Sequence, residues 1–198
     1  MPAKKIILAS GSPRRISLLK EWRLKFEVLP SGADETTKLT RPSYMVKELA
    51  LRKGRDVSKR IRGKAVIISA DTIVLLNGKI TGKPKNKKDS EKILRELNGS
   101  FHKVYTGVAV IDKSSNKESV FYDAAKVKMK KLSEKNLGKL FGKHMDKAGA
   151  YAVQDSNDGF VEKIYGDYYT VVGLPFFSLK KELAKFGIKL KSLRKACR

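Results

Sequence analysis

Residues 4–22 constrain the fold more than any other stretch, because they read KKIILASGSPRRISLLKEW and predict a buried strand that leads directly into a helix. The apolar run ends at a turn of small residues. Ser12 can cap the helix that follows, and Pro13 suits its first position. Apolar side chains then recur on one helical face at Ile16, Leu19 and Trp22. A strand, a turn and a helix start in this order favour an α/β fold.

The rest of the chain alternates strands and helices first and then forms antiparallel pairs. Strands are predicted by β-branched or alternating runs at residues 26–30, 65–76, 79–82, 102–112 and 119–129. Helices are predicted at residues 43–58, 89–99, 133–142 and 176–186, the third with a capping box from Ser133 to Asn136. The Asn-Gly pair at 77–78 and the SSNK turn indicate hairpins. This order predicts an α/β fold with a mixed twisted sheet flanked by helices, in one domain over residues 1–198.

The formal charge of +24 suggests an anionic partner: a nucleic acid, an anionic membrane or a phosphorylated small molecule. Lysine supplies most of the 44 cations, and the excess is spread over both halves of the chain without a basic tail. Aromatic residues are not interleaved with the basic runs, and no helix-turn-helix or RNP-like pattern occurs. Nucleic acid is therefore not favoured as a partner.

Targeting and redox features are sparse. No segment has the pattern of a signal peptide or a membrane span, so no membrane partner is expected. The single cysteine, Cys197, cannot form an intramolecular disulfide, which fits a cytoplasmic location. With one cysteine and two histidines, the chain lacks the usual zinc ligands, so we expect carboxylate oxygens and Mg²⁺-like ions.

The turn at the first helix start suits an anion. Helix N-termini present unpaired N–H groups and the positive end of the helix dipole. Ser10 and Ser12 add hydroxyl donors, while Arg14 and Arg15 add forked guanidinium groups. Taken alone, these residues fit a phosphate pocket and an ordinary surface helix start about equally well.

Two further residues indicate chemistry. Asp71 interrupts an apolar strand, where a carboxylate either caps backbone N–H groups or binds a metal and activates water. Lys83 lies between a glycine and a proline in a tight turn and can reach a phosphate as a point charge, although, taken by itself, a solvated lysine at a hairpin exit is the preferred interpretation. Together with the helix start, they predict metal-assisted attack on a polyphosphate.

Five segments occur in the order and approximate spacing found in the Maf proteins: ILASGSPRR, SADTIV, GKP, MDKAGAYAVQ and DYYTVVGLP. The chain resembles this family over nearly its whole length. Maf proteins are nucleoside triphosphate pyrophosphatases related in fold to inosine triphosphate pyrophosphatases, so the resemblance implies two lobes with a central cleft. It also implies hydrolysis between the α- and β-phosphates with a divalent cation, Mg²⁺ or Mn²⁺. Homodimers are common in the family, which leaves a dimer open here.

The resemblance also implies roles for individual residues. Asp71 matches the proton acceptor of the family, and Asp71 with Glu35 would hold the metal. The substrate contacts correspond to Ser10, Arg14, Arg15, Glu35, Lys53 and Lys83. Without this resemblance, the sequence favours simpler interpretations: Glu35 as a solvated loop acid and Lys53 as one of many surface lysines.

Substrate choice in the family is tied to three positions, here Arg14, Thr72 and Gln154. The glutamine after AGAY matches the subgroup that acts on dTTP and UTP, since an amide can donate to and accept from a pyrimidine edge. Asp155 and Asn157 stand where the family often has glycines. Both residue types tolerate positive φ, but Asp155 adds negative charge near the base pocket.

Two alternatives remain open at this point. A nucleotidyltransferase would also use a Gly/Ser loop with an arginine and a later acid, but it would need an acceptor. A non-catalytic nucleic-acid-binding protein is supported by charge alone. Dependence on salt and on Mg²⁺ separates these alternatives from a pyrophosphatase.

Overall fold

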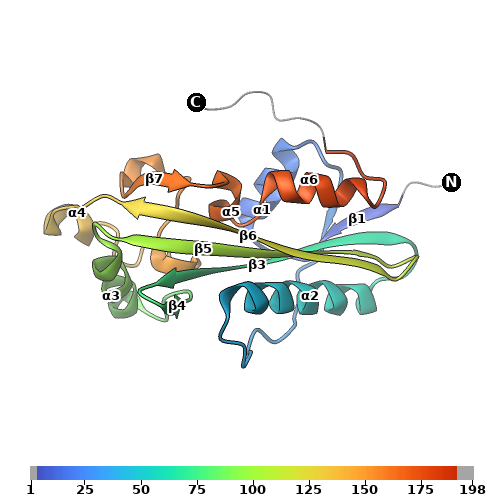
Figure 1. Cartoon of the computed structure of the whole chain (residues 1–198), viewed down its shortest axis with the longest axis horizontal. Coiled ribbons are helices and arrows are strands. Elements are labelled where there is room, and N and C mark those ends of the chain that lie inside the picture. Colours follow the sequence, from blue (N-terminus) through green and yellow to red (C-terminus); the bar gives the residue numbers. More distant parts are fainter. Residues whose placement is uncertain (1–3, 191–198) are drawn as a thin grey trace.

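A single mixed sheet of seven strands forms the framework of the protein, in a computed structural model that describes residues 4–190 (Figure 1). The strands are β1 (Lys5–Leu8), β2 (Glu27–Val28), β3 (Ala65–Leu76), β4 (Lys79–Thr81), β5 (Phe101–Asp112), β6 (Lys117–Met129) and β7 (Val161–Tyr165). The helices are α1 (Pro13–Glu21), α2 (Pro42–Arg60), α3 (Lys87–Leu97), α4 (Glu134–Gly138), α5 (Tyr168–Val172) and α6 (Phe176–Ala184), with 3₁₀ turns η1 (Ala148–Ala150) and η2 (Ser156–Asp158). The predicted α/β fold with a mixed sheet is confirmed.

The strand order leaves a gap at one edge of β3. The sheet runs β2-β1-β3-β5-β6-β7, with β1 parallel to β2 and β3 and the other pairs antiparallel. On the edge of β3 away from β5, β1 pairs with residues 65–68 and β4 pairs with residues 74–76. No described strand pairs with residues 69–73 on that edge. The polar residues Asp71 and Thr72 of β3 therefore lie where no described strand flanks that edge.

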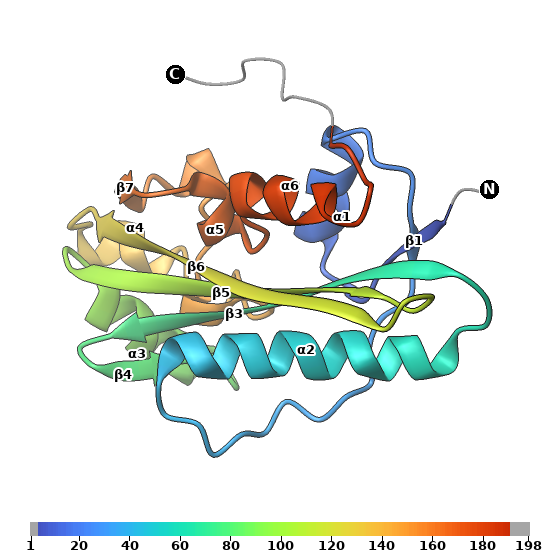
Figure 2. The same cartoon turned by 45° about the vertical axis from the view of Figure 1, so that its right-hand side comes forward.

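Helices cover the two faces of the sheet unequally. In both views α2 lies along one face, while α1, α5 and α6 lie along the other (Figures 1 and 2). The α2 helix approaches β5 very closely, because a Cβ at Gly107 would stand 2.2 Å from the carbonyl oxygen of Val46. Gly107 pairs in register with Asp71 of β3. Its missing side chain thus lets α2 reach the strand beside that carboxylate.

Apolar side chains form two cores on the face opposite α2. One contains Leu8, Trp22, Val108, Phe176 and Leu179 under α1 and α6. The other lies under α3 and α4 and contains Val104, Leu94, Leu97, Tyr151 and Phe160. The long strands β3 and β5 contribute to both cores, which gives two halves joined by shared strands.

Several element boundaries differ from the sequence-based prediction. The helix expected over 133–142 ends at Gly138, because glycine is a poor helix former and Gly142 adopts φ 79°, outside the helical region. The predicted capping box is wrong: Ser133 occupies the N-cap position without a side-chain cap hydrogen bond. Ser12 is likewise the N-cap of α1 by position only. The strand at 26–30 shortens to Glu27–Val28.

The described helices include none that is both long enough and apolar enough to span a bilayer. Cys197, on which the disulfide argument rested, lies outside the described residues.

Candidate active site

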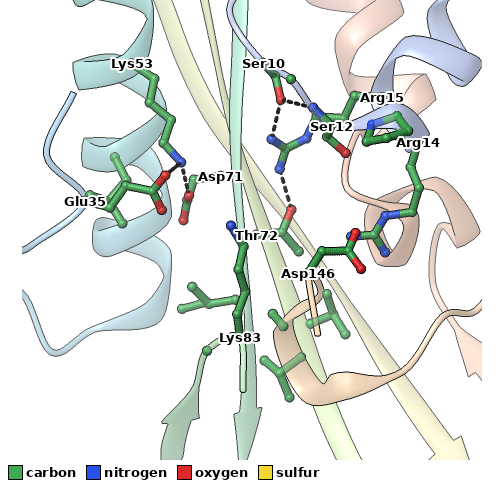
Figure 3. A pocket seen from close by; sticks show the side chains of 18 of the residues that line it. Ser10, Ser12, Arg14, Arg15, Glu35, Lys53, Asp71, Thr72, Lys83 and Asp146 are labelled. Carbon is green, nitrogen blue, oxygen red and sulfur yellow. Dashed lines mark hydrogen bonds and ion pairs between the residues drawn. The ribbon is translucent and has the colours of Figure 1, made fainter. Parts of the chain in front are cut away.

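A cleft of about 560 Å³ opens at the gap in β3, between α2 and the start of α1 (Figure 3). Eight of the nine predicted site residues line it: Ser10, Arg14, Arg15, Glu35, Lys53, Asp71, Thr72 and Lys83. They come from the β1–α1 turn, the first turn of α1, the connection to α2, α2 itself, β3 and the turn after β4. A cleft of this volume is in the range that holds small-molecule ligands.

Arg15 is fixed in the wall of the cleft. Its Nε donates to the carbonyl of Gly173 at 2.9 Å, and its two terminal nitrogens donate to Ser10 Oγ at 3.0 Å and Thr72 Oγ1 at 3.1 Å. Burial lowers the pKa of Arg15 to about 10, so the guanidinium remains a cation at neutral pH. Asp71 and Glu35 act against that shift. Arg15 therefore presents a fixed positive charge.

Gly173 makes room for this arrangement. It adopts φ 113°, and a Cβ there would lie 3.1 Å from Thr72 Oγ1 and 3.5 Å from Arg15 Nε. The glycine of DYYTVVGLP thus serves the site through its backbone.

Ser10 connects the β1–α1 turn to Arg15 through two hydrogen bonds. Its Oγ accepts from the backbone N–H of Ser12 at 3.3 Å and from Arg15 at 3.0 Å. A hydroxyl has two acceptor positions and one donor. With both acceptor positions used, the hydroxyl hydrogen is available for an anion in the cleft.

Thr72 acts through its neighbours. Thr106 Oγ1 donates its single hydrogen to the carbonyl of Thr170 at 2.7 Å. In the hydrogen bond between Thr106 Oγ1 and Thr72 Oγ1, at 3.0 Å, the donor is therefore Thr72. Thr72 also accepts from Arg15. Its donor is thus directed into the protein, and Thr72 is a positioning residue for Arg15.

Arg14 also lines the cleft and is half-buried. Figure 3 shows its guanidinium facing Asp146, on the segment before η1. Burial lowers the pKa of Arg14, and the charge of Asp146 acts against this shift. Asp146 lines the cleft, but the sequence analysis gave it no role, although it lies inside the quoted MDKAG motif. An acid within that motif was the signal available.

The opposite wall carries an ion-pair cluster. Lys53 Nζ of α2 lies 2.7 Å from Asp71 Oδ1 and 3.0 Å from Glu35 Oε1. The side chains of Lys53 and Asp71 are 12% and 9% exposed, whereas that of Glu35 is 57% exposed. Burial works to raise the pKa of Glu35, but Lys53, Lys83 and Arg15 together hold that pKa below its ordinary value. Glu35 is therefore ionised at neutral pH.

Lys83 reaches the cleft from the turn after β4 and points toward Asp71 and Thr72 (Figure 3). The turn is attached to η1, because the N–H of Gly149 donates to the carbonyl of Gly82 at 3.1 Å. Lys83 is exposed, as a residue that meets an incoming anion must be.

Gln154 differs from the other predicted residues. It is exposed and is not among the residues that line the cleft, whereas its neighbour Val153 lines it. Its part in base recognition stays a prediction. Asp155 and Asn157 do not use positive φ in the turn that follows, because η2 takes up this segment with negative φ and Gly159 provides the left-handed position.

Tyr151 lines the cleft and was also not singled out from the sequence. Its hydroxyl lies 2.8 Å from His102 Nε2 on β5. Burial raises the pKa of Tyr151 and lowers that of His102 to about 4, so both are neutral near pH 7. A neutral, hydrogen-bonded pair thus supports the floor of the cleft.

Two sets of side chains have ligand chemistry for a metal. Asp71 and Glu35 already share one cation, Lys53, and their hard oxygen donors suit Mg²⁺ or Mn²⁺ beside phosphate oxygens. Outside the cleft lining, His144, Asp155 and Asp158 form the only group of three or more such side chains in the described part of the chain. Lys143 contacts both of these aspartates, at 2.8 and 2.5 Å, so their charge is already compensated. Both sets of carboxylates are thus paired with a lysine, Lys53 in the cleft and Lys143 outside it.

Comparisons with known proteins show sequence relatives of the chain and solved structures of similar fold. The dTTP/UTP pyrophosphatases of Elusimicrobium minutum and Alkaliphilus metalliredigens are 45% and 46% identical to the chain over 92% and 94% of its length and 99% of theirs. Among solved structures, a HAM1 protein from Coxiella burnetii is similar in fold, with a TM-score of 0.54 at 14% identity, over 92% of this chain and 100% of that one. The family model described as Maf-like protein matches residues 5–186. The chain therefore belongs to the Maf family.

Proposed function

We propose that the protein hydrolyses nucleoside triphosphates between the α- and β-phosphates and releases a nucleoside monophosphate and pyrophosphate. One observation carries this proposal: Arg14 and Arg15 in the first turn of α1, together with Lys83, line the same cleft as Asp71. The names of the relatives, dTTP/UTP pyrophosphatases, support the same reaction.

The phosphate chain is assigned to the wall at α1. Arg14 and the first N–H groups of the helix bind phosphate oxygens, and Ser10 donates its remaining hydroxyl hydrogen. Arg15 adds a charge whose position does not change. Lys83 approaches from the opposite side and balances the charge on the leaving pyrophosphate.

Asp71 is assigned as the proton acceptor. Water attacks the α-phosphorus, the bond from that phosphorus to the bridging oxygen breaks, and the electron pair leaves with pyrophosphate. The proton of the water passes to Asp71 Oδ2, since Lys53 holds Oδ1. A divalent cation bound by Asp71 and Glu35 would neutralise charge on the phosphate oxygens.

The base is assigned to the apolar side of the cleft, which Tyr151 and Val153 line. Gln154 follows Val153 in the chain. We propose a thymine or uracil base, as in the relatives named for dTTP and UTP. Rotation of the exposed Gln154 would bring its amide to the pyrimidine edge.

The test measures released pyrophosphate across a panel of canonical and modified nucleoside triphosphates with Mg²⁺ or Mn²⁺. For dTTP or UTP, Asp71→Asn is expected to lower kcat by about 10²- to 10⁴-fold, the usual contribution of a general base. Asp123→Asn is the matched control, because this β6 carboxylate lies outside the cleft lining. Both variants should keep the melting temperature near that of the wild type. Folded, metal-supplied protein that releases no pyrophosphate from any nucleotide would refute the proposal.

A further inference from the structure

One part of the sheet, on the face that carries α2, exposes aromatic rings and lysines side by side. Residues paired directly across strands share a face, and the register pairs Phe101 with Lys128, Lys103 with Lys126, and Lys126 with Tyr165. We call this surface the aromatic–lysine face; it comprises Phe101, Lys103, Tyr105, Tyr122, Lys126, Lys128, Lys163 and Tyr165. The three most exposed rings, Phe101, Tyr122 and Tyr165, are 44%, 46% and 46% exposed.

The rings on this face occur in two pairs. Tyr105 and Tyr122 stack with centroids 6.3 Å apart, and Phe101 and Tyr165 lie 6.5 Å apart. An ammonium group accompanies each pair. Lys126 Nζ lies 4.3 Å from the centroid of Phe101, and Lys47 Nζ of α2 lies 5.8 Å from that of Tyr122. Flat rings with cations beside them provide stacking surfaces and charge in one place.

The same face carries like charges directly opposite each other. Lys103 pairs in register with Lys126, and Lys128 pairs with Lys163. Such cross-strand pairs destabilise a sheet. Glu162 compensates Lys128 at 2.6 Å. An anionic partner would relieve the remaining repulsion.

We propose that the aromatic–lysine face binds a single-stranded polynucleotide. Phosphates would lie against the lysines, and unpaired bases would stack on the rings, which is how proteins bind single strands without sequence readout. A duplex hides its base faces and could use only the charge. A second copy of the chain bound through the same face would bring the two sets of lysines together, so charge opposes that occupant.

This inference departs from the sequence-based expectation that nucleic acid is not favoured. Along the chain, aromatic residues do not alternate with basic runs. Across strands they do, because the register places Lys126 of β6 between Lys103 of β5 and Tyr165 of β7.

The aromatic–lysine face borders the cleft without sharing its phosphate-binding residues. Tyr105 pairs in register with Ile73, a residue of the cleft lining, and Gly107 pairs with Asp71. None of the residues of the face belongs to that lining. Polynucleotide binding and pyrophosphate release can therefore be tested separately.

The first experiment measures fluorescence anisotropy of labelled oligothymidylate and oligouridylate of equal length, with a duplex of the same length for comparison. We expect the single strands to bind more tightly than the duplex. With four lysines at phosphates, the logarithm of the association constant should fall with that of salt with a slope of about −3. Tighter binding of either single strand identifies the preferred combination of sugar and pyrimidine.

The key variant is Phe101→Ala with Lys126→Ala, which removes one ring and the ammonium above it. The matched control is Phe177→Ala with Lys181→Ala on α6, because Phe177 is 67% exposed on the opposite side of the sheet. The key variant should bind about tenfold more weakly, as expected when one stacking ring is lost. The control should bind as the wild type does. Hydrolysis of dTTP should be unchanged in both.

A second variant, Lys103→Gln, separates loss of binding from loss of folding. It removes one of two opposed charges, so its melting temperature should stay the same or rise while binding weakens. A misfolded protein cannot give that combination.

The proposal is overturned if the wild type binds no single strand at low salt. It is also overturned if the duplex binds equally well, or if the key and control variants lose affinity equally. A dimer in sedimentation that dissociates in the key variant, without polynucleotide binding, would assign the face to a second copy instead. None of these outcomes bears on pyrophosphate release.

Discussion

The two walls of the cleft hold their charges in different ways. On one wall, Arg15 is held by three hydrogen bonds that fix its guanidinium. On the other, Lys53 bridges the carboxylates of Asp71 and Glu35, and the Glu35 side chain is 57% exposed on the connection before α2. A cation fixed at three points cannot move without breaking its turn, whereas an exposed carboxylate can. The phosphate wall is therefore preformed, and the acid wall can adjust to a substrate with its metal.

The largest expected loss of stability comes from a substitution in the wall that holds Arg15. Arg15→Ala removes three charge-assisted hydrogen bonds and should lower the free energy of unfolding by about 3 kcal/mol, measured by urea denaturation. Lys83→Ala is the control, since Lys83 is exposed and its loss should leave the unfolding midpoint unchanged. Equal midpoints for the two variants would mean that Arg15 is not a structural part of its wall.

The His102–Tyr151 pair in the floor of the cleft should also contribute to stability, and its contribution should depend on pH. Burial lowers the pKa of His102 to about 4. Below pH 6.5, histidine in the unfolded chain is therefore protonated while His102 in the folded protein is still neutral, and the folded protein loses stability as pH falls. The loss should reach about 2 kcal/mol at pH 5.

The measurement compares urea midpoints at pH 7 and pH 5 for the wild type and His102→Gln. Glutamine can still bond the Tyr151 hydroxyl but does not titrate, so the variant should lose less stability over this range. An identical loss in both proteins would contradict the assignment.

A smaller effect sharpens the contrast between the two adjacent arginines. Arg14→Ala should raise KM for dTTP about tenfold, since one charge-assisted contact to phosphate is lost, while the unfolding midpoint stays near that of the wild type. Steady-state kinetics and urea denaturation on the same preparation check this, with Arg62→Ala as an exposed arginine outside the cleft. A large fall in stability with unchanged KM would show that Arg14 has a structural role and does not bind the phosphate.

The smallest effect concerns the hydroxyl chain behind Arg15. Thr106→Val removes the acceptor of Thr72, so the Thr72 hydroxyl becomes free to turn away from Arg15. We expect a loss of about 1 kcal/mol in stability and a change of a few-fold in the ratio of kcat/KM for dTTP to that for dCTP. An unchanged ratio would show that Thr72 affects substrate choice without Thr106.

Much of the site was accessible to sequence reasoning, because its residues occur in short motifs with a local physical meaning. The helix start at Pro13, the carboxylate at Asp71 in an apolar strand and the constrained Lys83 each have a recognisable pattern. His102 did not, since a lone histidine has no distinctive spacing, and Asp146 lies inside the MDKAG motif, which does not show the partner of this acid. Their roles follow from packing against Arg14 and Tyr151.

Apart from β7 and α5, the sequence by itself determined the order of strands and helices and the residues able to bind phosphate. The reason is that propensity, turns and side-chain chemistry act over a few neighbouring positions. Only the tertiary structure decided which of these residues meet. Strand register sets which side chains share a face, and it joins positions far apart in the chain, such as Asp71 with Gly107 and Lys126 with Tyr165. The linear order of residues does not contain that register, so the support of Arg15 and the aromatic–lysine face emerge only from the folded sheet.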